Sequence, residues 1–173
     1  MNEVTKTLCT RRSVRKFKNE QIPQKELDEI LKCGLYAPSG KNNQDVKIVV
    51  IRNRELITKI AEVNGSFVNK PGLNPFYDAP TLLIVFANSN HVTYIHDGSA
   101  TIMNMLNAAF SLKIDSCWIH RAKETFETDF GKKLKEEWGL GEEYEGIGNV
   151  VLGYRDIELP PSAPRKDRLI FVE

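Results

Sequence analysis

Two short segments carry most of the chemistry of this chain: Arg11-Arg12-Ser13-Val14-Arg15-Lys16-Phe17-Lys18 and, one helix later, Ala37-Pro38-Ser39-Gly40-Lys41-Asn42-Asn43-Gln44. Five cations and no acid fall within positions 11–18. Arginine offers a planar fork of donors that suits phosphate oxygens, and the hydroxyl of Ser13 adds one more donor. The second segment is rich in amide and hydroxyl groups, which can bind the edge of a flat heterocycle. Together the two segments predict a site for a phosphorylated aromatic cofactor.

The apolar pattern around these segments predicts a mixture of helices and strands. Helices are expected over 2–10, 22–37, 55–63, 97–112 and 126–138, and strands over 46–52, 80–87, 116–119, 147–154 and 169–172. The loop 64–77 contains two glycines and two prolines and is expected to be irregular. Because the helices and strands do not alternate strictly as βαβ units, the predicted fold class is α+β rather than a doubly wound sheet.

Two of these elements are unusually apolar. Leu82-Leu83-Ile84-Val85-Phe86 is an unbroken apolar run, which is typical of a central strand buried on both faces. The helix over 97–112 is apolar nearly all round. Such a helix must be covered on several sides, either inside the domain or by a second subunit.

Length and composition favour a small soluble protein. The chain has 173 residues, so we expect one domain spanning 1–173. Its 24 Lys and Arg against 23 Asp and Glu give a net charge of +1, which argues against a globally basic nucleic-acid binder. No apolar run is long enough to cross a membrane and the first residues lack a signal peptide's apolar region, so a cytoplasmic location is expected. Three widely spaced cysteines fit a reducing compartment.

Several familiar motifs fail on inspection. Ser39-Gly40-Lys41 resembles part of a P-loop, but Leu35 and Asn42 stand where that motif needs Gly and Ser or Thr. The glycine pairs at 139–141 and 146–148 each lack the third glycine of a dinucleotide fingerprint. His91 and His96 are spaced five apart, whereas helical metal ligands need three or four, so no metal site is expected.

The motif that holds is the ordered pair of segments. Arg11-Arg12-Ser13-Val14-Arg15-Lys16-Phe17, followed by Ala37-Pro38-Ser39 and Asn42-Asn43-Gln44, resembles the flavin-binding signature of the nitroreductase family of FMN-dependent, NAD(P)H-oxidising enzymes. The resemblance continues at Ser116-Cys117-Trp118-Ile119-His120, and then at Gly153-Tyr154, Pro161, Pro164 and Arg165. It spans nearly the whole chain in the family's order, and the length is similar to that of the family's shorter branch.

The resemblance implies an architecture as well as a cofactor. The expected fold is a central, mostly antiparallel sheet flanked by helices, in an intertwined homodimer with flavin sites at the subunit interface. The C-terminal strand, Leu169–Val172, would be exchanged into the partner's sheet. The implied cofactors are FMN and, as electron donor, NADH or NADPH.

The resemblance also assigns site residues. The FMN phosphate would be held by the cation cluster Arg11, Arg12, Ser13 and Arg15, with help from the tail residues Arg165 and Lys166 or Arg168. The flavin ring of the other subunit would be reached by the turn residues Pro38, Ser39, Gly40, Asn42 and Gln44. The segment Cys117, Trp118, Ile119 and His120 would lie along the ring, with backbone groups near N5. His120 either contacts flavin or substrate or is an exposed loop histidine, and the sequence leaves both open.

Two departures from the family pattern concern the substrate pocket. Asp45-Val46 stands where many members have Pro and an aromatic residue, and Gly40 stands where some have a second hydroxyl residue.

The activity that the resemblance implies is ping-pong hydride transfer from NAD(P)H through flavin N5 to a small electrophile such as a nitroaromatic or a quinone. The alternatives are a specialised flavoprotein with another electron donor or one defined metabolite, and a non-enzymatic module that binds polyanions through residues 11–18. Neither nucleic acid nor a membrane is the expected partner.

Overall fold

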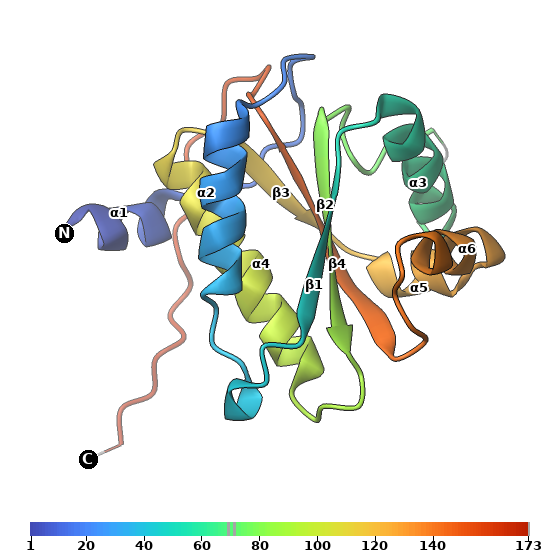
Figure 1. The fold of residues 1–173 in the computed structure, drawn as a ribbon. Helices are drawn as coiled ribbons and strands as arrows, with labels where there is room; N and C mark the ends of the chain where they lie inside the picture. Colours follow the sequence, from blue (N-terminus) through green and yellow to red (C-terminus); the bar gives the residue numbers. More distant parts are fainter. Residues whose placement is uncertain (69, 71, 173) are drawn as a thin grey trace.

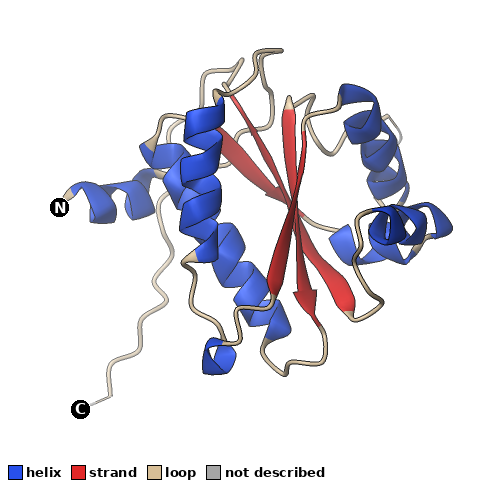
Figure 2. Cartoon of the chain, viewed as in Figure 1, coloured by secondary structure: helices blue, strands red, loops and turns tan. Residues whose placement is uncertain are grey.

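The computed structural model describes residues 1–68, 70 and 72–172. In chain order its elements are α1 (Glu3–Thr10), α2 (Gln24–Leu35), the 3-10 turn η1 (Gly40–Asn42), β1 (Val46–Ile51), α3 (Arg54–Ser66), β2 (Thr81–Asn88), α4 (Tyr94–Ser111), β3 (Asp115–Ile119), α5 (Ala122–Glu127), α6 (Asp129–Glu137) and β4 (Tyr144–Gly153) (Figures 1 and 2). The strands predicted over 46–52, 80–87, 116–119 and 147–154 are confirmed, as are the helices over 2–10, 22–37, 55–63 and 97–112, with shifts of a few residues at their ends.

The strands form one antiparallel sheet in the order β1-β2-β4-β3, which confirms the α+β class and the antiparallel sheet. Helices α2 and α4 cover one face, and α3, α5 and α6 cover the other (Figures 1 and 2). The predicted central strand is β2, whose residues 82–86 are all fully buried. Alternate side chains of β2 enter the two cores: Leu83 belongs to the same core cluster as Met105 of α4, and Phe86 packs against Phe126 of α5. The sheet has two edges, β1 and β3.

Helix α4 is only partly covered by its own chain. Its Ile102, Met105 and Leu106 are buried against the sheet and α2, whereas Ile95 is 52% exposed and Met103 is 37% exposed. No helix within the described part of the chain is long and apolar enough to cross a membrane.

The helix predicted over 126–138 is two helices, and that prediction was wrong. Thr128 has extended backbone angles (φ −69°, ψ 159°), and its hydroxyl accepts a hydrogen bond from the Gly131 N–H at 3.1 Å. A threonine that caps a new helix competes with continuing the old one. Apolar residues of the two helices still share one face despite the break. Phe126 and Trp138 pack against each other with ring centroids 5.7 Å apart.

The predicted loop over 64–77 and the predicted strand over 169–172 also differ from the structure. Helix α3 runs to Ser66, so the loop predicted over 64–77 begins after it, and positions 69 and 71 of that loop lie outside the described residues. The strand predicted over 169–172 is absent from the single chain. Leu169, Ile170, Phe171 and Val172 are 73%, 90%, 82% and 92% exposed, on a tail that leaves the body of the chain (Figure 1). An extended segment becomes a strand only where a sheet edge offers it hydrogen bonds.

Candidate functional site

The cation cluster, defined as Arg11, Arg12, Ser13 and Arg15, is fastened to the start of β3. The Val14 N–H donates to the Ser116 carbonyl at 3.0 Å, and Ser13 forms a parallel bridge with Ser116. Val14 is fully buried and Phe17 is nearly so, and both belong to the core beneath the sheet. The chain thus fixes its most cationic segment along the outer edge of β3.

The cation cluster lacks an anion of its own. None of the ion pairs in the described part of the chain includes Arg11, Arg12 or Arg15, whereas the neighbouring Lys16 pairs with Asp156 at 3.2 Å. The Nη1 atom of Arg11 is shielded from solvent and has no hydrogen-bond partner among the described residues. A buried charged donor without an acceptor is costly, so this atom points to an anionic ligand.

The nearby thiol of Cys117 does not fill that role. Burial raises the pKa of Cys117, and this effect outweighs the influence of Arg15, Ser13 and Arg11, which favours the thiolate. Cys117 therefore stays a neutral thiol at physiological pH. The donor set that remains, guanidinium groups with a hydroxyl, fits a phosphate dianion.

The C-terminal tail, residues 160–172, contacts the cation cluster only through its first residue, Pro160. Arg12 donates from Nη1 to the Pro160 carbonyl at 3.1 Å. The predicted helpers Arg165, Lys166 and Arg168 are exposed, and no hydrogen bond or ion pair of the described residues joins them to the cluster. The single chain therefore does not bring them together with Arg11 and Arg15.

The turn 38–44 is held by Asp97, in the first turn of α4. Its Oδ1 accepts from the Gly40 N–H at 2.9 Å, and its Oδ2 accepts from the Thr93 hydroxyl at 3.0 Å. A Cβ at Gly40 would lie 2.1 Å from the Thr93 hydroxyl oxygen, which explains why position 40 is a glycine. Ser39 is used within the turn, since its hydroxyl accepts from the Gln44 N–H at 3.0 Å.

The turn is also strained. Lys41, Asn42 and Gln44 have φ values of 52°, 55° and 53°, in the left-handed region that L-residues rarely adopt. Pro38, Asn42 and Gln44 are exposed. Strained, exposed and polar backbone of this kind is common in ligand-binding segments.

Asp45 follows the turn and precedes β1, and its carboxylate contacts residues at the end of β2 and the start of β4. Its carboxylate accepts from the Tyr144 hydroxyl and from Asn88 Nδ2, the latter at 2.7 Å, and lies 3.2 Å from His91 Nε2. The Tyr144 hydrogen bond holds the pKa of Asp45 below its usual range, and the same bond raises the pKa of Tyr144 to about 12. Asp45 thus links the turn to Asn88, His91 and Tyr144.

Tyr144→Phe should lower the free energy of unfolding by about 1 kcal/mol at pH 7, the net value of one such hydrogen bond. Because the pKa of Asp45 is depressed on folding, its contribution is present above the unfolded value of ~3.9 and is lost as the pH falls through the folded value. Because the pKa of Tyr144 is raised, its contribution is lost as the pH rises from ~10 through about 12. Urea unfolding at several pH values should show a constant difference from wild type between roughly pH 5 and 9, and a difference that stays constant below pH 3 would contradict the pair.

The two halves of the predicted site lie at opposite ends of α4. The turn is bonded to Asp97 near the start of that helix, and the cation cluster is bonded to Ser116, just past its end. At 1.5 Å per residue the 18 residues of α4 span about 27 Å (Figure 1). One chain therefore does not bring residues 38–44 together with the cation cluster.

The segment 117–120 extends away from the cluster along an edge of the sheet. Cys117 is buried, Trp118 and Ile119 are half-buried, and His120 is exposed just beyond the end of β3. From Ser116 to His120 a strand advances about 13 Å. The structure thus places His120 at one end of β3 and the cation cluster at the other.

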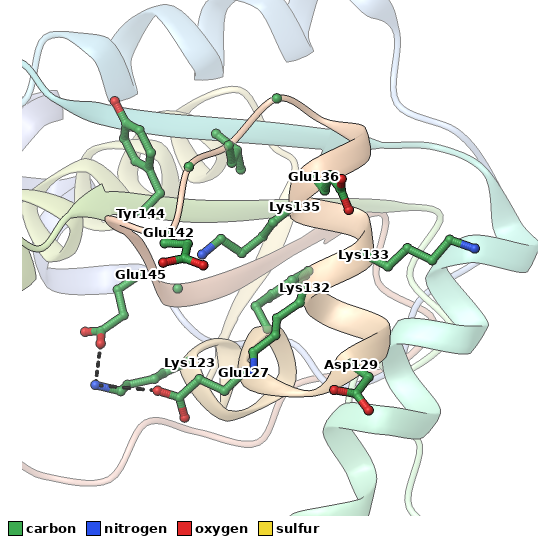
Figure 3. A pocket seen from close by; sticks show the side chains of 15 residues that line it. Lys123, Glu127, Asp129, Lys132, Lys133, Lys135, Glu136, Glu142, Tyr144 and Glu145 are labelled. Carbon is green, nitrogen blue, oxygen red and sulfur yellow. Dashed lines mark ion pairs between the residues drawn. The ribbon is translucent and has the colours of Figure 1, made fainter.

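Two hollows of the described surface lie away from the predicted site residues. The larger, of about 1000 Å³, is framed by α5, α6 and the start of β4, and Lys123 pairs there with Glu145 and, at 3.8 Å, with Glu127 (Figure 3). The smaller, of about 420 Å³, includes Arg155, whose guanidinium pairs with Asp115 at 2.7 Å. Neither contains a predicted site residue.

Comparison with known proteins identifies the family. The sequence profile of the Nitroreductase family matches residues 8–72, which include the cation cluster and the turn. A protein of Archaeoglobus fulgidus named NADH dehydrogenase/NAD(P)H nitroreductase is 31% identical over 161 residues, which covers 89% of this chain and 86% of that protein. The chain belongs to the nitroreductase family. The crystal structure of a Bacteroides fragilis nitroreductase with bound FMN matches this family member with a TM-score of 0.91 and 29% identity over 100% of both chains.

A second relative is named for the reaction that it catalyses. The Bacillus subtilis protein named FMN reductase [NAD(P)H] is 31% identical over 121 residues, which covers 67% of this nitroreductase-family chain and 46% of that protein. The resemblance to the nitroreductase family drawn from the two segments is confirmed.

Sequence reasoning missed Asp97, which holds the turn, and two buried asparagines, Asn64 and Asn149, which hydrogen-bond to the His120 carbonyl. Asp97 was recognisable only as an acid at the start of an apolar helix, a pattern also expected of any helix N-terminus. Asn64 and Asn149 are buried, at 1% and 0% exposure, inside segments whose neighbours are apolar. A polar residue within an apolar run was the one available indication of them.

Proposed function

We propose that this chain is an FMN-dependent NAD(P)H oxidoreductase of the nitroreductase family, with residues 1–173 acting as one FMN-binding domain. The observation that carries the proposal is the buried, unpartnered Nη1 of Arg11 within a cation cluster that has no anion of its own. Arg11, Arg12, Ser13 and Arg15 would hold the ribityl phosphate, with Arg165 and Lys166 or Arg168 brought in by the tail. The FMN bound in the Bacteroides fragilis relative supports the choice of ligand.

The same proposal requires a homodimer. The turn with Pro38, Ser39, Gly40, Asn42 and Gln44 lies too far along α4 to reach a flavin held by its own chain, so it would serve the flavin of the partner. Exposed apolar residues near that turn, Leu35 at 68% and Tyr36 at 78%, together with Ile95 on α4, suit a subunit interface.

The tail would complete the dimer by strand exchange. Residues 169–172 are apolar and exposed, and they pair with none of the described strands of their own chain. The outer edge of β3 is already paired with Ser13 at its start, whereas the outer edge of β1 has no pairing among the described residues. We infer that the tail adds to β1 of the partner subunit.

When bound, FMN supplies hydride transfer through N5, in a ping-pong cycle between NADH or NADPH and a small electrophile such as a nitroaromatic or a quinone. The protein's part is to anchor the phosphate through the cation cluster and to lay the segment Cys117, Trp118, Ile119 and His120 along the ring. A backbone N–H near His120 would stabilise negative charge on the ring. No side chain is assigned as an essential acid or base.

The test is a visible absorption spectrum of the purified protein, recorded without oxygen before and after NADH or NADPH is added. We expect a flavin spectrum that bleaches with at least one of the two donors. A flavin spectrum that neither donor bleaches would point to a different electron donor. A colourless protein that takes up no added FMN would overturn the proposal, and binding to polyanions in a salt-dependent way would then be the property to measure.

A further inference from the structure

The loop between β3 and α5 is anchored by buried side chains. The His120 carbonyl accepts hydrogen bonds from Asn64 Nδ2 at 3.0 Å and from Asn149 Nδ2 at 3.3 Å. The Arg121 carbonyl accepts from the N–H and the hydroxyl of Thr125, at 3.0 and 2.6 Å, and Asn64 also donates to that hydroxyl at 3.1 Å. Three side chains from α3, β4 and α5, each at most 1% exposed, thus converge on two consecutive carbonyls.

This anchoring is achieved at a cost in stability. The Oδ1 atoms of Asn64 and Asn149 are both shielded from solvent and have no hydrogen-bond donor among the described residues. A buried carbonyl without a donor is unfavourable, and leucine has the same branched arrangement of four side-chain heavy atoms without that penalty. Retaining two such side chains on a single carbonyl indicates that the position of this carbonyl matters.

The carbonyl sets the direction of the next N–H. All peptide bonds of the described chain are trans, and in a trans peptide the C=O and the following N–H point in opposite directions. Because the His120 carbonyl is directed toward buried Asn64 and Asn149, the Arg121 N–H is directed away from the interior. That N–H has no acceptor among the described residues. Arg121 itself has φ +70°, a strained left-handed conformation that the anchored carbonyls hold in place.

We propose that Asn64 and Asn149 are positioning residues, which hold the 120–121 peptide so that the Arg121 N–H donates a hydrogen bond to the flavin ring. This inference rests on the proposed function, since it needs the phosphate to lie at the cation cluster. The cluster is fastened to Ser116 and the Arg121 N–H lies past the other end of β3, so one extended ligand can reach both. Asn64 and Asn149 touch neither the ligand nor the cluster and act only through the loop.

The decisive variant is Asn149→Leu, which removes the donor and the unsatisfied Oδ1 together. The thermal midpoint of the FMN-free protein should stay at or above the wild-type value, because the substitution removes an unsatisfied buried oxygen and the His120 carbonyl keeps its hydrogen bond from Asn64. The dissociation constant for FMN should rise about fivefold, which corresponds to one lost hydrogen bond. Thr81→Val is the matched control, because Thr81 is another fully buried polar residue of the sheet, hydrogen-bonded to Gln21 at 2.7 Å, and its FMN affinity should be that of wild type.

A direct readout separates positioning from a general effect on the fold. In protein labelled with ¹⁵N-arginine, the Arg121 amide resonance, assigned by its disappearance in Arg121→Lys, should move downfield when FMN is added to the FMN-free wild type. It should move much less in Asn149→Leu and as in wild type in Thr81→Val. An Arg121 amide that does not respond in wild type, or an Asn149→Leu protein with wild-type affinity and shift, would overturn the inference while leaving the proposed function intact.

Two further outcomes complete the test. If wild type binds no FMN at all, both the proposed function and this inference fail. If Asn149→Leu does not fold, Asn149→Asp takes its place, since a protonated carboxyl can donate to the His120 carbonyl and an ionised one cannot. FMN affinity relative to wild type should then fall as the pH rises through the pKa of the introduced acid, and an affinity ratio that is constant with pH overturns the inference.

Discussion

Arg11→Met should raise the dissociation constant for FMN by roughly 100-fold, because a hydrogen bond between a guanidinium and a phosphate contributes up to about 3 kcal/mol. The Nη1 atom of Arg11 is already shielded from water and has no partner, so its desolvation cost is present before the ligand arrives. A ligand phosphate would recover that cost. Methionine keeps an apolar stem of similar length, so the packing of the segment on β3 should be preserved.

The same substitution should change stability in opposite directions with and without the ligand. Removing a buried donor that has no partner should leave the FMN-free protein as stable as wild type or more stable. The additional stability that FMN gives should shrink, because that increment depends on the ratio of ligand concentration to dissociation constant. Fluorescence titration with FMN and thermal unfolding at two FMN concentrations measure both effects.

A matched control for Arg11→Met lies five residues away in the same basic segment. Lys16 is 62% exposed and pairs with Asp156, so Lys16→Met should change the FMN dissociation constant less than about twofold. Riboflavin, which lacks the phosphate, should bind wild type and Arg11→Met alike. Equal losses for Arg11→Met and Lys16→Met, or a loss that riboflavin shares, would place the phosphate elsewhere.

The features that could be predicted from the sequence are those that depend on neighbouring residues. Five cations without an acid between positions 11 and 18 are enough to predict an anionic ligand from the local sequence. The buried run 82–86 likewise predicts a central strand, because each residue contributes the same apolar preference. The order of elements follows from the apolar spacing, whereas the antiparallel sheet was implied by the resemblance to the nitroreductase family.

The parts that were not predictable depend on contacts between distant positions. Asn64 and Asn149 meet at the His120 carbonyl across 56 and 29 residues of sequence, and Asp97 meets Gly40 across 57. Periodicity does not encode such pairings. The break at Thr128 was missed for another reason: a side-chain cap and a helical apolar spacing coexist there, and local spacing alone does not decide between them.

Ending the chain at Lys166 should convert the protein to a monomer and reduce FMN affinity by roughly 100-fold, since two or more hydrogen bonds from the partner's turn would be lost. The deletion removes the exposed apolar side chains of 169–172, each of which contributes about 1.5–3 kcal/mol when fully buried. It keeps Arg165 and Lys166. Light scattering after gel filtration gives the mass, and the flavin absorbance per chain gives the occupancy.

A second variant separates assembly from phosphate binding. Arg165→Ala combined with Lys166→Ala leaves the apolar tail intact, so this protein should remain a dimer and lose about tenfold in FMN affinity, the effect expected for one charge-assisted hydrogen bond. The two results together distinguish a tail that joins subunits from a tail that only supplies cations. A chain ending at Lys166 that stays dimeric and fully loaded with FMN would show that strand exchange is unnecessary. The exposed residues of α2 and α4 would then be enough to hold the turn of one subunit against the flavin of the other.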